Sequence, residues 1–196
     1  IDASGYDPTP DENNGDGSRV FNIDAGDDPS LMDVSISGLT ITGGDPSGQG
    51  GAIFNIEKLT LAQSTITGNA ASSGGGILNG SRMIGYYYQN GEYYFLYKNG
   101  QALISNCTIS GNSAVFGGGG LAGGGLTVVG STIRENTGGG VSGSGTITSS
   151  SIVNNEGIGA SFSGAISLSA IENNTGNGIY AGTTLTVDDC TIIGNG

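Results

Sequence analysis

Few residues of this chain are of types that could do chemistry, and the clearest group lies near the N-terminus. Asp11, Asn13 and Asp16 lie close together in the sequence, and Gly17 follows directly. Carboxylate and amide oxygens are the ligands that calcium takes in proteins, and a glycine allows the sharp turn of a calcium loop. The spacing is not that of an EF-hand. These three residues are the candidate calcium ligands, with a solvated acidic turn as the alternative.

The other acidic residues do not form a catalytic pattern. The chain has 17 acids, five bases and no histidine. Glycoside hydrolysis needs two carboxylates that face one another, and a lyase needs a positioned base. The acids are concentrated in residues 2–33, and later ones such as Glu57, Glu92 and Glu172 are scattered. We therefore expect no catalytic residues and no cofactor apart from calcium; a polysaccharide-active enzyme is the alternative.

A tyrosine-rich stretch at residues 81–101 could bind a partner. It holds six of the eight tyrosines, and Asn90-Gly91 between two aromatic runs is a strong hairpin signal. A two-residue turn would pair Tyr88 with Tyr93, Tyr86 with Phe95, and Ile84 with Tyr97. The flank of the protein would cover one face of this hairpin. The predicted partner-binding face holds Tyr86, Tyr88, Tyr93, Phe95 and Tyr97.

The elements that must position these residues come from a repeated phrase. Six copies end in Asn, and LTITGG at 39–44 is a seventh that ends in Gly. With the tyrosine stretch removed, the period is roughly 20–25 residues, which is typical of stacked repeats. Each period holds three short apolar segments separated by Gly, Asn and Ser. The six copies are STITGN (64–69), CTISGN (107–112), STIREN (131–136), SSIVNN (150–155), SAIENN (169–174) and CTIIGN (190–195).

Three short strands joined by tight turns form one coil of a parallel β-helix. We predict an all-β chain of about seven coils, with residues 1–196 as one domain and 81–101 as an inserted β-hairpin. The phrase-ending Asn can adopt a left-handed turn conformation, and stacked amides can bond one another. The predicted ladder is Asn69, Asn112, Asn136, Asn155, Asn174 and Asn195. The predicted buried column is Ile66, Ile109, Ile133, Ile152, Ile171 and Ile192.

The two cysteines share one position of the repeat, four coils apart. At about 4.8 Å per coil their separation is roughly 19 Å. A disulfide needs Cα atoms within about 7 Å, so no bridge between Cys107 and Cys190 is expected.

The phrases GGAIFN (50–55), LTLA (59–62) and STITGN carry a resemblance to a known superfamily. The chain resembles the right-handed parallel β-helix repeats of the pectate-lyase-like superfamily. It is most similar to noncatalytic bacterial surface proteins of that group, including repeats of polymorphic outer-membrane proteins. Gly50, Gly51, Ala52 and Ile53 match their GGA[I/L/V] motif, but Phe54 and Asn55 are adjacent where the family has FxxN. The resemblance implies a right-handed solenoid at the cell surface.

The net charge of −12 excludes nucleic acid as a partner, because such binding needs a basic surface. No apolar window is long enough to span a membrane. We expect a mature fragment or processed subunit that is extracellular, with a structural or adhesive role, such as a fibre or surface-layer subunit. Open coil ends expose unpaired strand edges, which predicts a homo-oligomer or a head-to-tail polymer.

Glycans are the second candidate partner. The run NGEYYFLYKNG (90–100) resembles one cell-wall- or choline-binding repeat, with Tyr93 in place of its Trp. A carbohydrate-binding module is therefore an open alternative. Ice binding by paired threonines is a weaker one, because Arg134 and Val153 interrupt the array.

Overall fold

The computed structural model describes residues 1–10 and 12–196 and is all-β, as predicted. The one helical segment of the described residues is a 3-10 turn at Ser4–Tyr6, far too short to cross a membrane. Short segments of Ile, Leu, Val and Thr form the strands because such side chains suit a pleated, half-buried surface. The strands are β1 Phe21–Ile23, β2 Asp33–Ser37, β3 Thr40–Ile41, β4 Ile53–Asn55, β5 Lys58–Ala62, β6 Thr65–Thr67, β7 Ala70–Ala71, β8 Ile77–Asn79, β9 Ser81–Gln89, β10 Glu92–Asn99, β11 Gln101–Ser105, β12 Thr108–Ser110, β13 Ser113–Ala114, β14 Leu121–Val129, β15 Thr132–Arg134, β16 Val141–Thr148, β17 Ser151–Val153, β18 Ala160–Ser167, β19 Ala170–Glu172, β20 Ile179–Asp188 and β21 Thr191–Ile193.

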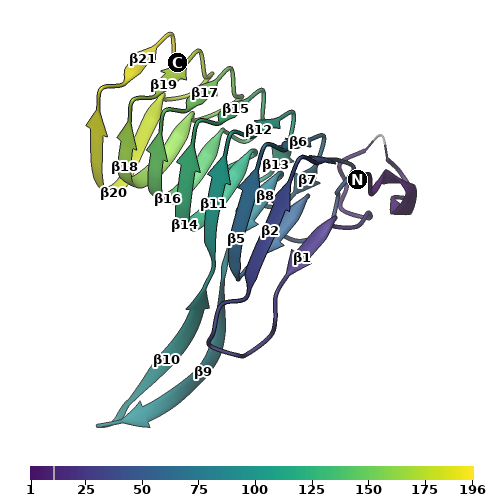
Figure 1. Cartoon of the computed structure of the whole chain (residues 1–196), viewed down its shortest axis with the longest axis vertical. Helices are drawn as coiled ribbons and strands as arrows, with labels where there is room; N and C mark the ends of the chain where they lie inside the picture. The colour runs from purple at the N-terminus through teal and green to yellow at the C-terminus, as the bar shows by residue number, and fades with distance from the viewer. Residues whose placement is uncertain (11) are drawn as a thin grey trace.

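Two long parallel sheets, together called the body below, contain most of these strands (Figure 1). The seven-stranded sheet runs β21-β19-β17-β15-β12-β6-β3, so each of its strands comes from one copy of the repeated phrase. A ten-stranded sheet contains the strands that follow in each repeat. β7 and β13 form a small parallel pair. In the chain, each lies between a strand of the seven-stranded sheet and a strand of the ten-stranded sheet. Strands that are neighbours in these parallel sheets therefore come from successive repeats of the chain.

One side of the apolar core is a column of isoleucines along the seven-stranded sheet, which packs with buried residues of the ten-stranded sheet. Ile66 aligns with Ile109 and Ile109 with Ile133, and the register continues repeat by repeat to Ile192. The predicted residues from Ile66 to Ile171 have no exposed surface. Ile192 is 44 % exposed, so the prediction was wrong there. The reason is that β21 is the edge strand of its sheet, and no strand of the described residues pairs with its outer side.

The later repeats hold two strands of the long sheets where three segments were predicted. β14 pairs with β8 through its first residues and with β11 through its last, and the register shifts between Gly123 and Leu126. β16, β18 and β20 are likewise single long strands that cover both of these segments. In the earlier repeats a corner separates the two halves. The tyrosine stretch enters the third of these corners, between β8 and β11.

The alignment of the flanking strands defines the size of the insertion. Asn79 aligns with Asn55, and Gln101 aligns with Lys58. Residues 80–100 therefore stand where the preceding repeat has only Ile56 and Glu57, one residue fewer than the predicted corner of Ile56–Lys58. β9 and β10 form an antiparallel hairpin that projects away from the body (Figure 1).

The pairing of the hairpin follows the prediction only near its turn. Tyr88 lies opposite Tyr93, and Tyr86 lies opposite Phe95. A bulge between Leu96 and Tyr97 then places Met83, and not Ile84, opposite Tyr97. The predicted pair of Ile84 with Tyr97 was wrong because a bulge inserts one unpaired residue into a strand, and sequence gives little sign of it.

The left-handed turn residue lies one position before the phrase-ending Asn, not at the Asn as predicted. The asparagine side chain turns inward to bond its neighbours, so the residue before it makes the bend. Its φ is 54–68° in six repeats, at Gly68, Gly111, Glu135, Asn154, Asn173 and Gly194. A second turn of each repeat has φ of 48–57° at Gln63, Asn106, Gly130, Ser149, Leu168 and Asp189.

Candidate functional site

The predicted partner-binding residues of the hairpin form one contiguous aromatic face. Tyr88 and Tyr93 have ring centroids 4.9 Å apart, Tyr86 and Tyr93 are 5.7 Å apart, and Tyr86 and Phe95 are 6.4 Å apart. Tyr97 continues the same side of β10. The five side chains are 54–64 % exposed. Aromatic residues are rarely left this exposed in a group, so the face is a candidate contact surface.

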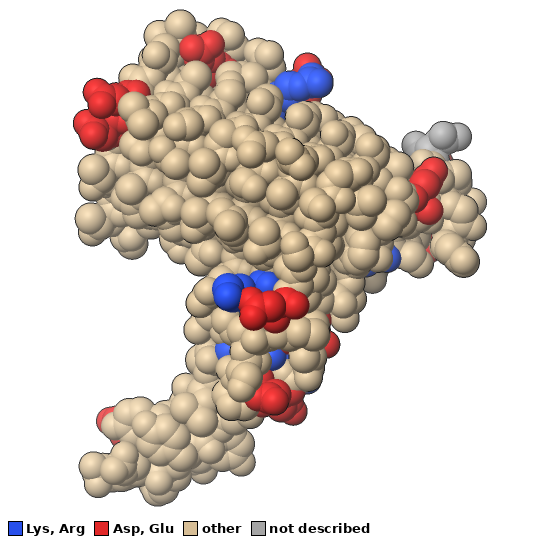
Figure 2. Space-filling view, viewed as in Figure 1, with Lys and Arg blue, Asp and Glu red and all other residues tan. Residues whose placement is uncertain are grey.

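The opposite face of the hairpin is also uncovered. Tyr87 and Tyr94 stack with centroids 5.1 Å apart and an interplanar angle of 11°. Their side chains and Leu96 are 40–46 % exposed. The expectation that the flank of the protein covers one face was therefore wrong. The hairpin leaves the body from two strand ends and points outward, so neither face lies on a sheet (Figure 1). Figure 2 shows that this projection carries few charged residues.

A buried ion pair fixes the base of the hairpin to the body. Lys98 Nζ lies 2.6 Å from Glu57 Oε1, and neither side chain has any exposed surface. The Glu57 carboxylate also accepts hydrogen bonds from the backbone N–H groups of Ala25 and Met32. Burial by itself would raise the pKa of Glu57, but these three donors outweigh it and lower the pKa below its ordinary value.

A second ion pair holds the other strand of the hairpin. Arg82 lies 2.7 Å from Asp24 Oδ2 and 3.1 Å from Asp27 Oδ1. Both acids belong to the loop of residues 24–32, which also donates to Glu57. Two strands, one loop and the body thus meet at one charged junction. An isolated two-stranded hairpin is marginal in water, so this junction supplies the anchorage that its uncovered faces do not.

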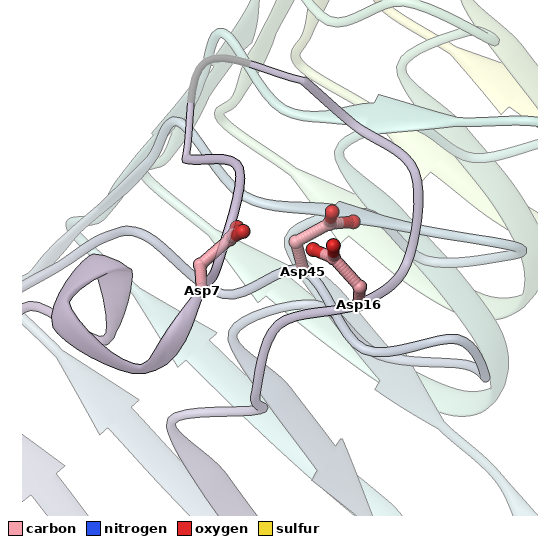
Figure 3. A group of neighbouring side chains, drawn as sticks. All are labelled: Asp7, Asp16 and Asp45. Carbon is pink, nitrogen blue, oxygen red and sulfur yellow. The ribbon is translucent and has the colours of Figure 1, made fainter.

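The carboxylates that the structure brings together near the N-terminus differ from the predicted calcium set. The carboxylate oxygens of Asp7, Asp16 and Asp45 all lie within 4.8 Å of one another (Figure 3). Asp16 belongs to the predicted set, whereas Asp11 lies outside the described residues. Asn13 lines a neighbouring surface groove that Asp45 shares. No local pattern selects Asp45, which comes about 30 residues after Asp16 and directly follows the phrase LTITGG.

Backbone contacts explain how this carboxylate group forms. Asp45 is buried and accepts hydrogen bonds from the N–H groups of Asn14 and Gly15, which wraps the N-terminal loop around it. Burial, followed by the neighbouring Asp16 and Asp45, raises the pKa of Asp7, although the N–H of Thr9 acts in the opposite direction. Among the described residues this is the group with the oxygen donors that a hard cation such as Ca²⁺ takes.

The six asparagines of the predicted ladder lie in one column. The amide nitrogen of each donates to the amide oxygen of the next at 2.8–3.1 Å, from Asn69 through Asn195. Each oxygen also accepts the backbone N–H of its neighbour. A shorter ladder joins Asn55 to Asn79 at 2.6 Å and was missed, because the hairpin separates the second Asn from its repeat pattern. Both ladders are internal and stabilise the stack.

Outside the Asp7–Asp16–Asp45 group, two of the later acids have basic partners. Glu57 is buried under the hairpin, and Arg134 pairs with the adjacent Glu135 on the surface. Cys107 and Cys190 are free thiols, as their spacing predicted.

The fold and these surfaces define an all-β repeat protein with long parallel sheets and an anchored aromatic hairpin. Comparison with models of known families, with characterised proteins and with solved structures gave no match to the chain.

Proposed function

We propose that this chain is a right-handed parallel β-helix of about seven coils with a noncatalytic structural or adhesive role outside the cell. Parallel sheets built from successive repeats, an internal asparagine ladder and a continuous isoleucine column support this architecture. The scattered charges of the body support a role without catalysis. The motifs GGAIFN and STITGN support a kinship with surface-exposed repeat proteins.

The single observation that carries the function is an aromatic hairpin that is exposed on both faces but rigidly anchored at its base. An aromatic side chain buries about 150–250 Å² in an interface. Five such residues at 54–64 % exposure offer roughly 600 Å². Two copies in contact would bury about 1,200 Å², which reaches the lower limit for a stable protein interface. The face with Tyr86, Tyr88, Tyr93, Phe95 and Tyr97 is the proposed contact surface.

The proposed occupant of this face is a second copy of the chain. The net charge of −12 makes copies repel one another over most of their surface. The hairpin beyond its base carries a single charge, at Glu92, so two hairpins meet without that repulsion. Head-to-tail addition at the edge strand β21 is the second proposed contact, because Ile192 and Ile193 are 44 % and 58 % exposed there. Assembly into a fibre or surface layer follows from two such contacts on one molecule.

Sedimentation velocity on face-specific variants tests this proposal. Tyr86→Thr/Tyr93→Thr/Phe95→Thr should abolish the contact between hairpins and so reduce the assembled mass, because threonine keeps strand propensity and removes the rings. Any assembly that remains would report the contact at β21. Tyr87→Thr/Tyr94→Thr is the matched control on the opposite face and should still assemble. Unchanged assembly of the triple variant would refute the contact surface.

Removal of the whole hairpin needs one compensating change. Replacement of residues 80–100 by a two-residue corner would leave the Glu57 carboxylate buried without Lys98, so the deletion should also carry Glu57→Gln. This variant should fold and fail to assemble through the hairpin. Any assembly that it retains reports the contact at β21. A glycan array with the same variant tests the alternative occupant, because glycan binding lost with the hairpin and unaccompanied by self-association would favour a carbohydrate-binding module.

A further inference from the structure

A surface groove with a volume of about 770 Å³ lies where the hairpin leaves the body. One wall comes from the side chains of Phe54 on β4 and Leu78 on β8, which are neighbours in the parallel register. The other wall is the base of the hairpin, at Ser81 and Asn99. Pockets for small ligands have volumes of about 300–1,000 Å³, so the groove has the size of a binding site.

Glycine at the corner keeps this groove open. Gly80 and Gly100 occupy the two ends of the inserted segment, and Gly124 and Gly125 stand in the register shift of β14. A side chain at Gly80 would begin 3.5 Å from the ring of Phe54 and 3.6 Å from Leu78, inside the groove. The backbone of Gly124 and Gly125 lies outside the ladder of paired residues and lines the floor. The lining thus combines apolar side chains with glycine backbone, in which the carbonyl oxygens of Gly100 and Gly124 accept hydrogen bonds from the Asn79 amide.

The polar side chains around the groove are all neutral. Gln49, Asn99 and Gln101 supply amides, and Ser81 and Ser144 supply hydroxyls. None of the described residues that line it is charged, although the chain has a net charge of −12. Amides both donate and accept hydrogen bonds, which matches ligands with many hydroxyl groups. None of these lining side chains would pair with an anionic ligand, and the net charge of −12 repels one.

Arg19 contacts the ring of Phe54 and the segment before it. The guanidinium of Arg19 lies 5.1 Å from the ring centroid, and the same side chain donates to the carbonyl oxygens of Gly50 and Gln49. Arg19 therefore holds the aromatic wall and the Gln49 segment together. A prearranged apolar wall opposite neutral amides is complementary to a sugar ring, which has an apolar C–H face and a rim of hydroxyls.

We infer that this groove binds a short neutral oligosaccharide, about two to three sugar rings in length by the volume range of small-ligand pockets. The inference is independent of the proposed self-association, because none of the five aromatic residues of the hairpin face lines the groove.

Amide chemical shifts in NMR spectra test the inference on the whole chain. The probes are the trisaccharides of cellulose, starch and chitin, with trigalacturonate as an acidic counterpart. At least one neutral trisaccharide should shift the amide signals of Gly80, Gly100 and Gly124, and trigalacturonate should bind at least tenfold more weakly. If no neutral trisaccharide binds at concentrations up to about ten millimolar, or if the shifts lie elsewhere, the inference is wrong.

Two matched glycine variants separate the groove from the hairpin. Gly80→Val should fill the groove and weaken binding at least tenfold, and the added Cβ meets its neighbours at ordinary contact distances. Gly85→Val makes the same change on the hairpin, where the nearest atom is 3.9 Å away, and should bind like the unaltered chain. The exposed pair Gln49→Ala/Gln101→Ala should weaken binding about tenfold, since each lost hydrogen bond is worth about 0.5–1.5 kcal/mol. Undiminished binding by Gly80→Val would overturn the inference, and equal loss in Gly85→Val would move the site to the hairpin.

Discussion

Lys98→Met should be among the most destabilising single substitutions that this chain can carry. The methionine keeps the length and apolar contacts of the lysine stem but removes the charge that lies 2.6 Å from Glu57. The carboxylate is then left fully buried with two backbone N–H donors and no cation. Removal of one partner from a buried ion pair costs about 3–5 kcal/mol. For a chain of 196 residues this corresponds to a fall in Tm of roughly 6–20 °C.

The double variant Glu57→Gln/Lys98→Met should be more stable than Lys98→Met alone. A glutamine at this position needs no cation, and its one oxygen can still accept from either Ala25 or Met32. The second N–H loses its acceptor, so we expect a remaining loss of about 1–3 kcal/mol. Recovery of stability when the second charge is also removed is the signature of an uncompensated buried charge.

Urea unfolding followed by circular dichroism measures these differences, and hydrogen exchange at the Ala25 and Met32 amides reports the junction itself. Lys58→Met is the control, because the Lys58–Asp33 pair is exposed and should contribute only about 0–1 kcal/mol. The pKa of Glu57 is lowered in the folded chain, so its contribution is present above its ordinary value of 4.5 and is lost as the pH falls through the lower folded pKa. Lys98→Met should weaken this pH dependence. For Lys98→Met we expect the free energy of unfolding to fall by about 3–5 kcal/mol, as for other buried pairs. A fall of less than about 1 kcal/mol would refute the reasoning.

Three further outcomes are expected. Asn136→Ala should lower the free energy of unfolding by about 1–3 kcal/mol, measured with urea, because it leaves buried ladder partners unbonded, whereas Asn195→Ala at the end of the ladder should cost less. Asp7→Asn should raise Tm at pH 7 but not below pH 3.8. The pKa of Asp7 is raised in the folded chain, so its ionisation opposes folding only when the pH is above its ordinary pKa of 3.8. An equal gain in Tm at both pH values would contradict this. Leu168→Asn should stabilise the chain by about 1 kcal/mol, because Leu168 has a φ of 50° and asparagine tolerates the left-handed region; an unchanged urea midpoint would show that the turn is not strained.

The hairpin shows how far sequence reasoning can reach toward a site. Asn90-Gly91 and the flanking aromatics were enough to predict the turn and the first pairs, because hairpin pairing is local. The bulge at Leu96 and Tyr97 was not predicted, because one unpaired residue in a strand leaves little sign in the alternation of side chains. The exposure of both faces was also missed, because it depends on the direction in which β9 and β10 leave the body.

The cluster of Asp7, Asp16 and Asp45 near the N-terminus could be predicted only in part. Asp16 was selected as a cation ligand from its neighbours in sequence, and the structure places it beside Asp7 and Asp45. Asp45 became part of the group only because the N-terminal loop folds back onto the turn after β3. No local pattern encodes that approach.

The repeated phrase by itself determined the all-β character of the chain, the parallel register of the isoleucines and the alignment of the asparagines. It could do so because each repeat meets only its neighbours, so a period in the sequence becomes a column in space. Tertiary structure alone decided which charged residues are buried together, where the groove opens and which turn residue bends the chain. Those features depend on contacts between segments that the period does not relate, such as Lys98 with Glu57, whose energies follow from burial and distance rather than from spacing along the chain.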